Sequence, residues 1–181
     1  MRMTNRVAAV LIAVSVLLGA CGGGGGGTVS APQFVKVACT DLGNWIKAIQ
    51  KRSQNVQQAA PQTPDEGKKV ISAFFDGVIA DTDKLIDQLK AAGTPDVKNG
   101  DKISSTVISA LEHARDALAS SKAKVENLPT DNPQAFAKAA QQMGQSVQSA
   151  FQKAGQLGSS LTSPELEAAA KKEPACQSLS S

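Results

Sequence analysis

Apolar residues recur along most of the chain at intervals of three and four, which is the spacing of one face of an α-helix. The pattern runs through four stretches separated by proline and glycine: residues 35–56, 71–89, 103–128 and 136–161. The strict alternation of a half-buried strand is not sustained anywhere, so β structure is disfavoured. The sequence therefore predicts four amphipathic helices of about 25–29 residues each.

Local signals set the expected ends of these helices. Residues 63–66 (Thr-Pro-Asp-Glu) start one, with a capping hydroxyl, a proline in the first turn and acids at the positive end of the helix dipole. Gly93 is placed to end the same helix. Residues 162–165 repeat the starting signal before a short helix over 165–172, which Pro174 is expected to stop.

Four amphipathic segments joined by mostly short loops predict an all-α fold, an antiparallel up-down four-helix bundle with a short C-terminal helix. We expect this domain to cover residues 32–181 and to be a monomer. The longest irregular stretch is 92–101. Its acids do not fit a calcium-binding loop, because Val107 stands where the twelfth-position glutamate would be. We interpret it as a connector between helices.

The N-terminus has the layout of a secretory signal peptide. Arg2 and Arg6 precede an apolar run from Val7 to Leu18. As a helix, residues 7–20 would measure about 21 Å, which is too short for the ~30 Å of hydrocarbon in a bilayer. The sequence therefore predicts export rather than a permanent membrane helix.

The motif Leu18-Gly19-Ala20-Cys21 resembles the lipobox of bacterial lipoproteins. That resemblance implies that residues 1–20 are removed and that Cys21 becomes the mature N-terminus, carrying thioether-linked lipid and palmitate. The protein would then be anchored on the outer face of the cell membrane. The alternative is an ordinary secreted protein cleaved after Ala20, although such cleavage prefers a small residue where Leu18 stands.

Six glycines follow Cys21 directly, at 22–27. A phosphate-binding loop would need a preceding strand and a following Lys-Ser or Lys-Thr, and neither is present. We interpret residues 21–31 as a flexible tether, whose glycine run has a root-mean-square reach of about 12–15 Å.

Composition argues against a nucleic-acid binder. Removing residues 1–20 takes Arg2 and Arg6 from the 19 basic residues, which leaves 17 against 16 acidic ones. No basic stripe exists, and five Phe, one Trp and no Tyr provide few stacking surfaces.

Two cysteines remain after Cys21, namely Cys39 and Cys176. In an exported protein such a pair predicts a disulfide. A structural metal site is the rival, but two thiols and the distant His113 do not complete a tetrahedral set. The antiparallel fold supports the disulfide, because the start of the first helix and the end of the fourth lie at the same end. In the chain-entropy model a loop of this length stabilises the fold by at most ~5 kcal/mol.

Catalytic signals are weak throughout the chain. His113 is the only histidine, and it lies at the edge of its helix's apolar stripe. No Gly-x-Ser-x-Gly motif is present. Asp76, Asp83 and Asp87 form an acidic strip that we interpret as a solvated face. We therefore expect a non-enzyme without a cofactor or metal.

The fourth helix has an unusual composition, because residues 139–152 carry no charge. In addition, the glycines at 144, 155 and 158 lower its helix propensity. It is either a surface helix that tolerates sequence variation and packs closely through its backbone, or a helix that loosens to admit a partner or ligand. The candidate partner face consists of Gln141, Gln145, Gln148 and Gln152.

The mature part also resembles the small secreted or lipid-anchored helical proteins of actinobacteria, a group without an assigned activity. The shared features are Ala38-Cys39 shortly before Trp45, the stretches 92–97 and 131–133, and the closing Cys176. The resemblance transfers no catalytic or binding residue to this chain.

Two functions stay open at this point. The first is a lipid-anchored interaction module that binds an envelope protein or polymer, and the second is a carrier or sensor of a small apolar ligand held between the helices. A cavity of about 300 Å³ or more would favour the carrier. A packed core with an exposed apolar patch would favour the interaction module.

Overall fold

The computed structural model describes residues 27–159 and 163–179, and most of them are helical. The four long helices are α1 (Ala31–Ala59), α2 (Pro64–Ala92), α3 (Gly100–Val125) and α4 (Pro133–Ser159). Two short helices follow, α5 (Pro164–Ala170) and α6 (Pro174–Gln177). Two strands of two residues each are present, β1 (Thr28–Val29) and β2 (Thr94–Pro95). The predicted all-α class is confirmed.

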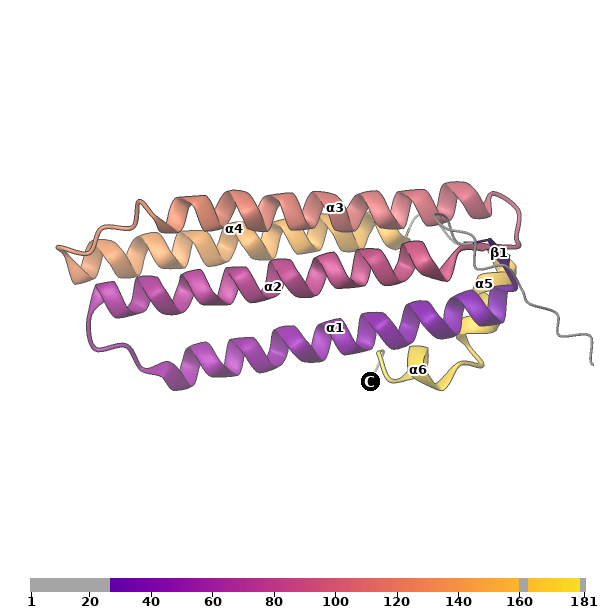
Figure 1. The fold of residues 1–181 in the computed structure, drawn as a ribbon, viewed down its shortest axis with the longest axis horizontal. Helices are drawn as coiled ribbons and strands as arrows, with labels where there is room; N and C mark the ends of the chain where they lie inside the picture. Colours follow the sequence, from indigo (N-terminus) through magenta and orange to yellow (C-terminus); the bar gives the residue numbers. More distant parts are fainter. Residues whose placement is uncertain (1–26, 160–162, 180–181) are drawn as a thin grey trace, which may run out of the picture.

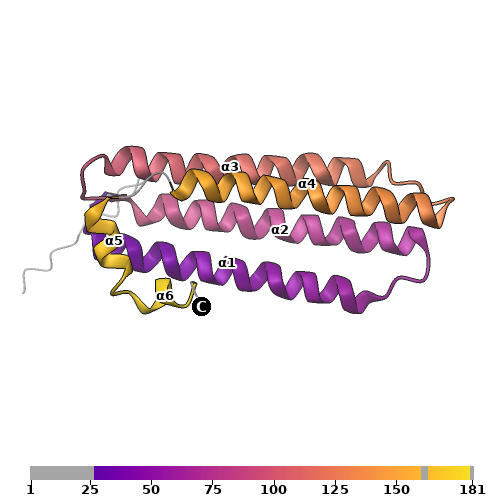
Figure 2. The same ribbon diagram turned by 180° about the vertical axis from the view of Figure 1, so that it is seen from behind.

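The four long helices lie side by side, and each runs antiparallel to the one before it (Figure 1). Along the chain each helix packs against the next, α1 on α2, α2 on α3 and α3 on α4. Viewed from behind, α4 lies over α2 and α3 rather than over α1 (Figure 2). Within the described residues, α1 and α4 make at most slight contact. The central helix is therefore α2, and α1 lies at the edge.

The predicted start and end of α2 are confirmed in detail. The Thr63 hydroxyl accepts a hydrogen bond of 3.2 Å from the backbone N–H of Glu66, and Pro64 occupies the first turn. Gly93 ends the helix with φ 85°, a conformation that favours glycine. At the start of α4, the Asn132 side chain accepts from the N–H groups of the next turn at 3.0 and 3.1 Å. These caps satisfy N–H groups that have no partner within the helix.

The C-terminal prediction needs one correction. As expected, the Ser163 hydroxyl caps the first short helix by accepting from the N–H of Leu166 at 3.1 Å. Pro174, predicted to stop that helix, instead begins a second one, α6, while α5 already ends at Ala170. Proline fits a first-turn position because its missing N–H would have no helical partner there.

The core lies mainly between α2, α3 and α4. Its buried cluster consists of Phe75, Val78, Leu118, Val125, Leu128 and Met143. In contrast, α1 buries only Phe34 and Val35, near its first turn. The rest of its apolar stripe is partly buried, and Ile49 packs against the core cluster.

β structure was disfavoured, yet β1 and β2 form a small parallel pair, with Thr28 opposite Thr94 and Val29 opposite Pro95. Backbone bonds continue the pairing, since the N–H of Asp96 donates to the Val29 carbonyl oxygen at 2.7 Å. Sequence alternation cannot reveal strands this short. Within the predicted tether, residues 28–29 are thus paired with the α2–α3 connector, and α1 begins at Ala31.

Candidate functional site

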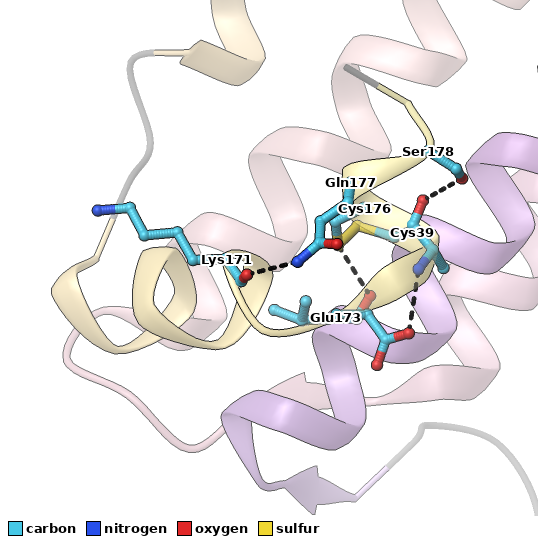
Figure 3. The surroundings of a disulfide bond; sticks show 8 residues. Cys39, Lys171, Glu173, Cys176, Gln177 and Ser178 are labelled. Carbon is cyan, nitrogen blue, oxygen red and sulfur yellow. Dashed lines mark hydrogen bonds between the residues drawn. A yellow bond between two sulfur atoms is a disulfide. The ribbon is translucent and has the colours of Figure 1, made fainter. Parts of the chain in front are cut away.

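A disulfide joins Cys39 of α1 to Cys176 of α6, with the sulfur atoms 2.00 Å apart and the α carbons 5.0 Å apart (Figure 3). The predicted pairing is present in the structure. The backbone N–H of Cys176 donates to the Glu173 carbonyl oxygen at 3.1 Å, and the Gln177 amide donates to the Lys171 carbonyl oxygen at 2.8 Å. The bridge therefore fastens the C-terminal hairpin, α5 and α6, against α1.

The remaining predicted site residues are Cys21 and the glutamines of α4. Cys21 lies outside the described residues. Gln141, Gln145 and Gln148 are exposed on α4, as a partner face requires. Gln152 belongs to the same helix, but its side chain lies outside the described part of the structure.

An apolar groove, here called the distal groove, lies between α1 and α2. Its lining consists of Ser53, Val56 and Gln57 from α1 and Ile71 and Phe74 from α2. Its volume is about 240 Å³, and none of the lining side chains is charged. The groove lies near the end of α1 and the start of α2. It is thus remote from the disulfide and β1, which lie at the opposite end of the helices (Figure 1).

The distal groove continues an apolar row along α1, here called the α1 seam. The seam consists of Leu42, Ile46, Ile49, Ser53 and Val56, and every one of them is half-exposed. The ring of Phe136 in α4 lies directly against Gly67 of α2, and it packs against the same buried core cluster as Ile71 and Phe74. Ile49 of the seam packs against the buried core cluster, as do Ile71 and Phe74 of α2, so the seam is partly covered. The sequence carried the signal for this surface, but its spacing is the same as that of a core face.

Polar contacts on the neighbouring face of α1 hold it in a defined rotation on α2. The Trp45 indole donates to the hydroxyl of the buried Thr82 at 3.1 Å. Arg52 donates twice to Asp81, from Nε at 2.6 Å and from Nη2 at 3.2 Å. The hydrogen bond to Asp81 raises the pKa of Arg52 despite an opposing effect of burial, so the guanidinium stays charged.

The acidic strip is largely exposed, as predicted, and two of its carboxylates also form ion pairs with α3. Asp76 forms an ion pair with Lys122, and Asp83 with Arg115 at 3.0 Å. Asp87 is exposed, as expected. Hydrogen bonds to Asp116 and Asp83 raise the pKa of Arg115. The strip therefore helps align α2 with α3.

Two further observations bear on chemistry. His113 is exposed, as predicted. Among the described residues, no three His, Cys, Asp or Glu side chains are close enough together to bind a metal ion. No helix in the described ranges has the length and hydropathy needed to cross a membrane.

Comparisons with protein-family models, curated proteins and solved structures find no significant match for this chain. A function has to be argued from the distal groove, the α1 seam and the sequence signals.

Proposed function

We propose that the protein is a non-catalytic, lipid-anchored interaction module that binds an envelope protein or polymer outside the cell membrane. The observation that carries the proposal is the apolar distal groove between α1 and α2, beside a packed core. Contiguous apolar surface of this kind marks interaction sites on soluble domains.

The proposed module is an antiparallel up-down four-helix bundle in which α1 packs on α2 and is joined to α6 by the disulfide. Both attachments of α1 support this arrangement.

The proposed anchor rests on the signal-like segment and on the resemblance of residues 18–21 to a lipobox. The anchored chain would enter the folded domain at β1, at the end that also holds the disulfide. Ser53 lies 22 residues after Ala31 in the same helix, or about 33 Å along its axis. In this arrangement the distal groove lies away from the bilayer and can reach partners further out in the envelope.

The anchor is tested by changing Cys21→Ala. We expect the wild-type protein to carry acyl mass and to remain with the membrane fraction, and the variant to lose both properties. Recovery of wild-type protein without acyl mass, or its release from membranes as readily as the variant, contradicts the anchor.

The carrier of an apolar ligand is the second candidate. Its support is the apolar lining of the distal groove, but about 240 Å³ falls below the ~300–1,000 Å³ typical of small-molecule pockets. The glutamine face on α4 is a separate surface, because the groove is lined by α1 and α2. We therefore favour the interaction module.

Photocrosslinking in cells tests the interaction. A photoreactive residue is placed at exposed Gln57 (Gln57→p-benzoylphenylalanine) in the full-length protein, with Lys51→p-benzoylphenylalanine on the outward face of α1 as the matched control. We expect adducts with one protein or polymer from position 57 and few or none from position 51. Lipid adducts alone would favour the carrier, and equal adducts from both positions would refute a defined binding surface.

A further inference from the structure

We propose that residues 171–179, here called the C-terminal strap, form a redox-controlled cover on α1. With the disulfide between Cys39 and Cys176 closed, the strap lies against one side of α1. Reduction of the disulfide releases the strap while the four long helices stay folded. The inference goes beyond the proposed function and does not depend on it.

The C-terminal strap lies outside the bundle. In two opposite views, α6 flanks α1 on the side away from α2 (Figure 1 and Figure 2). Among the described elements, α6 makes substantial contact with α1 alone. A β carbon at Gly43 of α1 would meet Leu179 of the strap at 3.5 Å. The buried core cluster contains no residue of the strap, so the core does not need the strap in place.

The disulfide is the strongest attachment of the strap to α1. No residue of α6 is buried, and Lys171 and Lys172 before it are exposed. The Gln177 amide donates to the Lys171 carbonyl oxygen, so this hydrogen bond stays within the strap (Figure 3). A helix of one turn is not stable by itself in water, because its nucleation costs more than its few hydrogen bonds contribute. Opening the bridge therefore removes what holds α6 in place.

A reductant can reach the bridge in the folded protein. Cys39 and Cys176 are each only half-buried. Exposed disulfides are the more readily reduced ones. In the proposed step, one thiolate of a dithiol attacks a sulfur of the bridge, and the second thiol of the dithiol resolves the mixed disulfide. The bridge gains two electrons and two protons to become two thiols, and the dithiol becomes a disulfide.

Release of the strap uncovers one side of α1 and leaves its contact with α2. The Val35 carbonyl oxygen lies 4.0 Å from the Cys176 sulfur. Val35, Cys39 and Gly43 follow one another at intervals of four residues and therefore share one side of the helix. By helical spacing, Trp45 lies on a different side, from which its indole donates to α2. Reduction thus changes the surface of α1 without opening the core.

The test compares three forms of the full-length protein. They are the disulfide-bonded form, the form reduced by dithiothreitol, and the double variant Cys39→Ser with Cys176→Ser, which lacks the bridge without added bulk. Leu179→Ala is the matched control, because it removes a contact of the strap with α1 and keeps the bridge. Hydrogen exchange detected by mass spectrometry follows residues 171–179 and the middle of α2 and α3.

We expect dithiothreitol to reduce the bridge in native buffer. With the bridge closed, strap amides should exchange at least about tenfold more slowly than in an unstructured peptide, and with the bridge open at nearly the peptide's rate. The middle of α2 and α3 should stay at least about a hundredfold slower than an unstructured peptide in every form. Leu179→Ala should change exchange of the strap less than about threefold, and reoxidation of the reduced protein should restore its slow exchange.

Four outcomes overturn the inference. The bridge is a fixed part of the fold if its reduction requires urea that also unfolds the bundle. Equal exchange of the strap with the bridge closed and open shows that noncovalent contacts hold it. Loss of protection in α2 and α3 on opening shows that the bundle depends on the bridge. Failure of reoxidation to restore slow exchange shows that the change is not a reversible switch.

Discussion

Gly77 provides a sharp test of how α1 is held on α2. The guanidinium of Arg52 lies directly over Gly77 of α2 and donates to Asp81. A β carbon at position 77 would overlap the guanidinium carbon and lie 2.7 Å from the Nε atom of Arg52. Two packed helices cannot move apart cheaply, whereas the end of an arginine side chain can swing away. We therefore expect Gly77→Ala to expel Arg52 from Asp81 and to leave the fold intact.

The magnitudes follow from exposure and helix propensity. The ion-paired side chains are 37% exposed for Arg52 and 22% for Asp81, so we assign the pair a surface value of about 0.5–1 kcal/mol. Alanine in place of glycine inside a helix raises the free energy of unfolding by about 0.5–1 kcal/mol. The two effects nearly cancel, and Gly77→Ala should change the free energy of unfolding by less than about 1 kcal/mol.

A double-mutant cycle measures the coupling. Urea unfolding of the wild type, Arg52→Ala, Gly77→Ala and the double variant gives four free energies. Arg52→Ala should cost about 0.5–1 kcal/mol in the wild type and close to nothing in the Gly77→Ala background. The reasoning is refuted if Gly77→Ala costs more than about 2 kcal/mol while Arg52→Ala costs the same in both backgrounds, because the helices would then have shifted and kept the ion pair.

Three further predictions concern the rest of the fold. Gly100→Ala should destabilise the protein by about 1–3 kcal/mol, because its β carbon would overlap the carbonyl oxygen of Pro95. Gly144→Ala has open space around it and should stabilise the protein by up to about 1 kcal/mol. Equal effects of the two changes in urea unfolding would contradict both predictions. Changing Cys39 and Cys176 together to Ser should lower the free energy of unfolding by about 2–5 kcal/mol, because the bridge closes a loop of 137 residues. A decrease below about 1 kcal/mol in the same assay would show that the disulfide adds little stability. Finally, residues 144–158 should exchange amide hydrogens faster than the middle of α2 and α3, and equal protection would show that α4 does not open locally.

Local chemistry determined much of the architecture. The threonine, proline and acids of residues 63–66 begin α2 as predicted, and Gly93 ends it, because caps depend on neighbours in the chain. The disulfide could also be predicted from the sequence. Only Cys39 and Cys176 remain after Cys21, and an antiparallel order of helices brings these two cysteines to one end.

The tertiary structure alone decided what each face touches. The spacing from Leu42 to Val56 predicts an apolar face, but it cannot say what that face touches; here Ile49 packs against the core cluster, while α4 packs on α3. In the same way, no local signal pairs Asp83 with Arg115 or brings β1 beside β2, because these partners are far apart in sequence. Periodicity records the orientation of a side chain within its own helix, whereas the distal groove arises from how α1 is placed on α2.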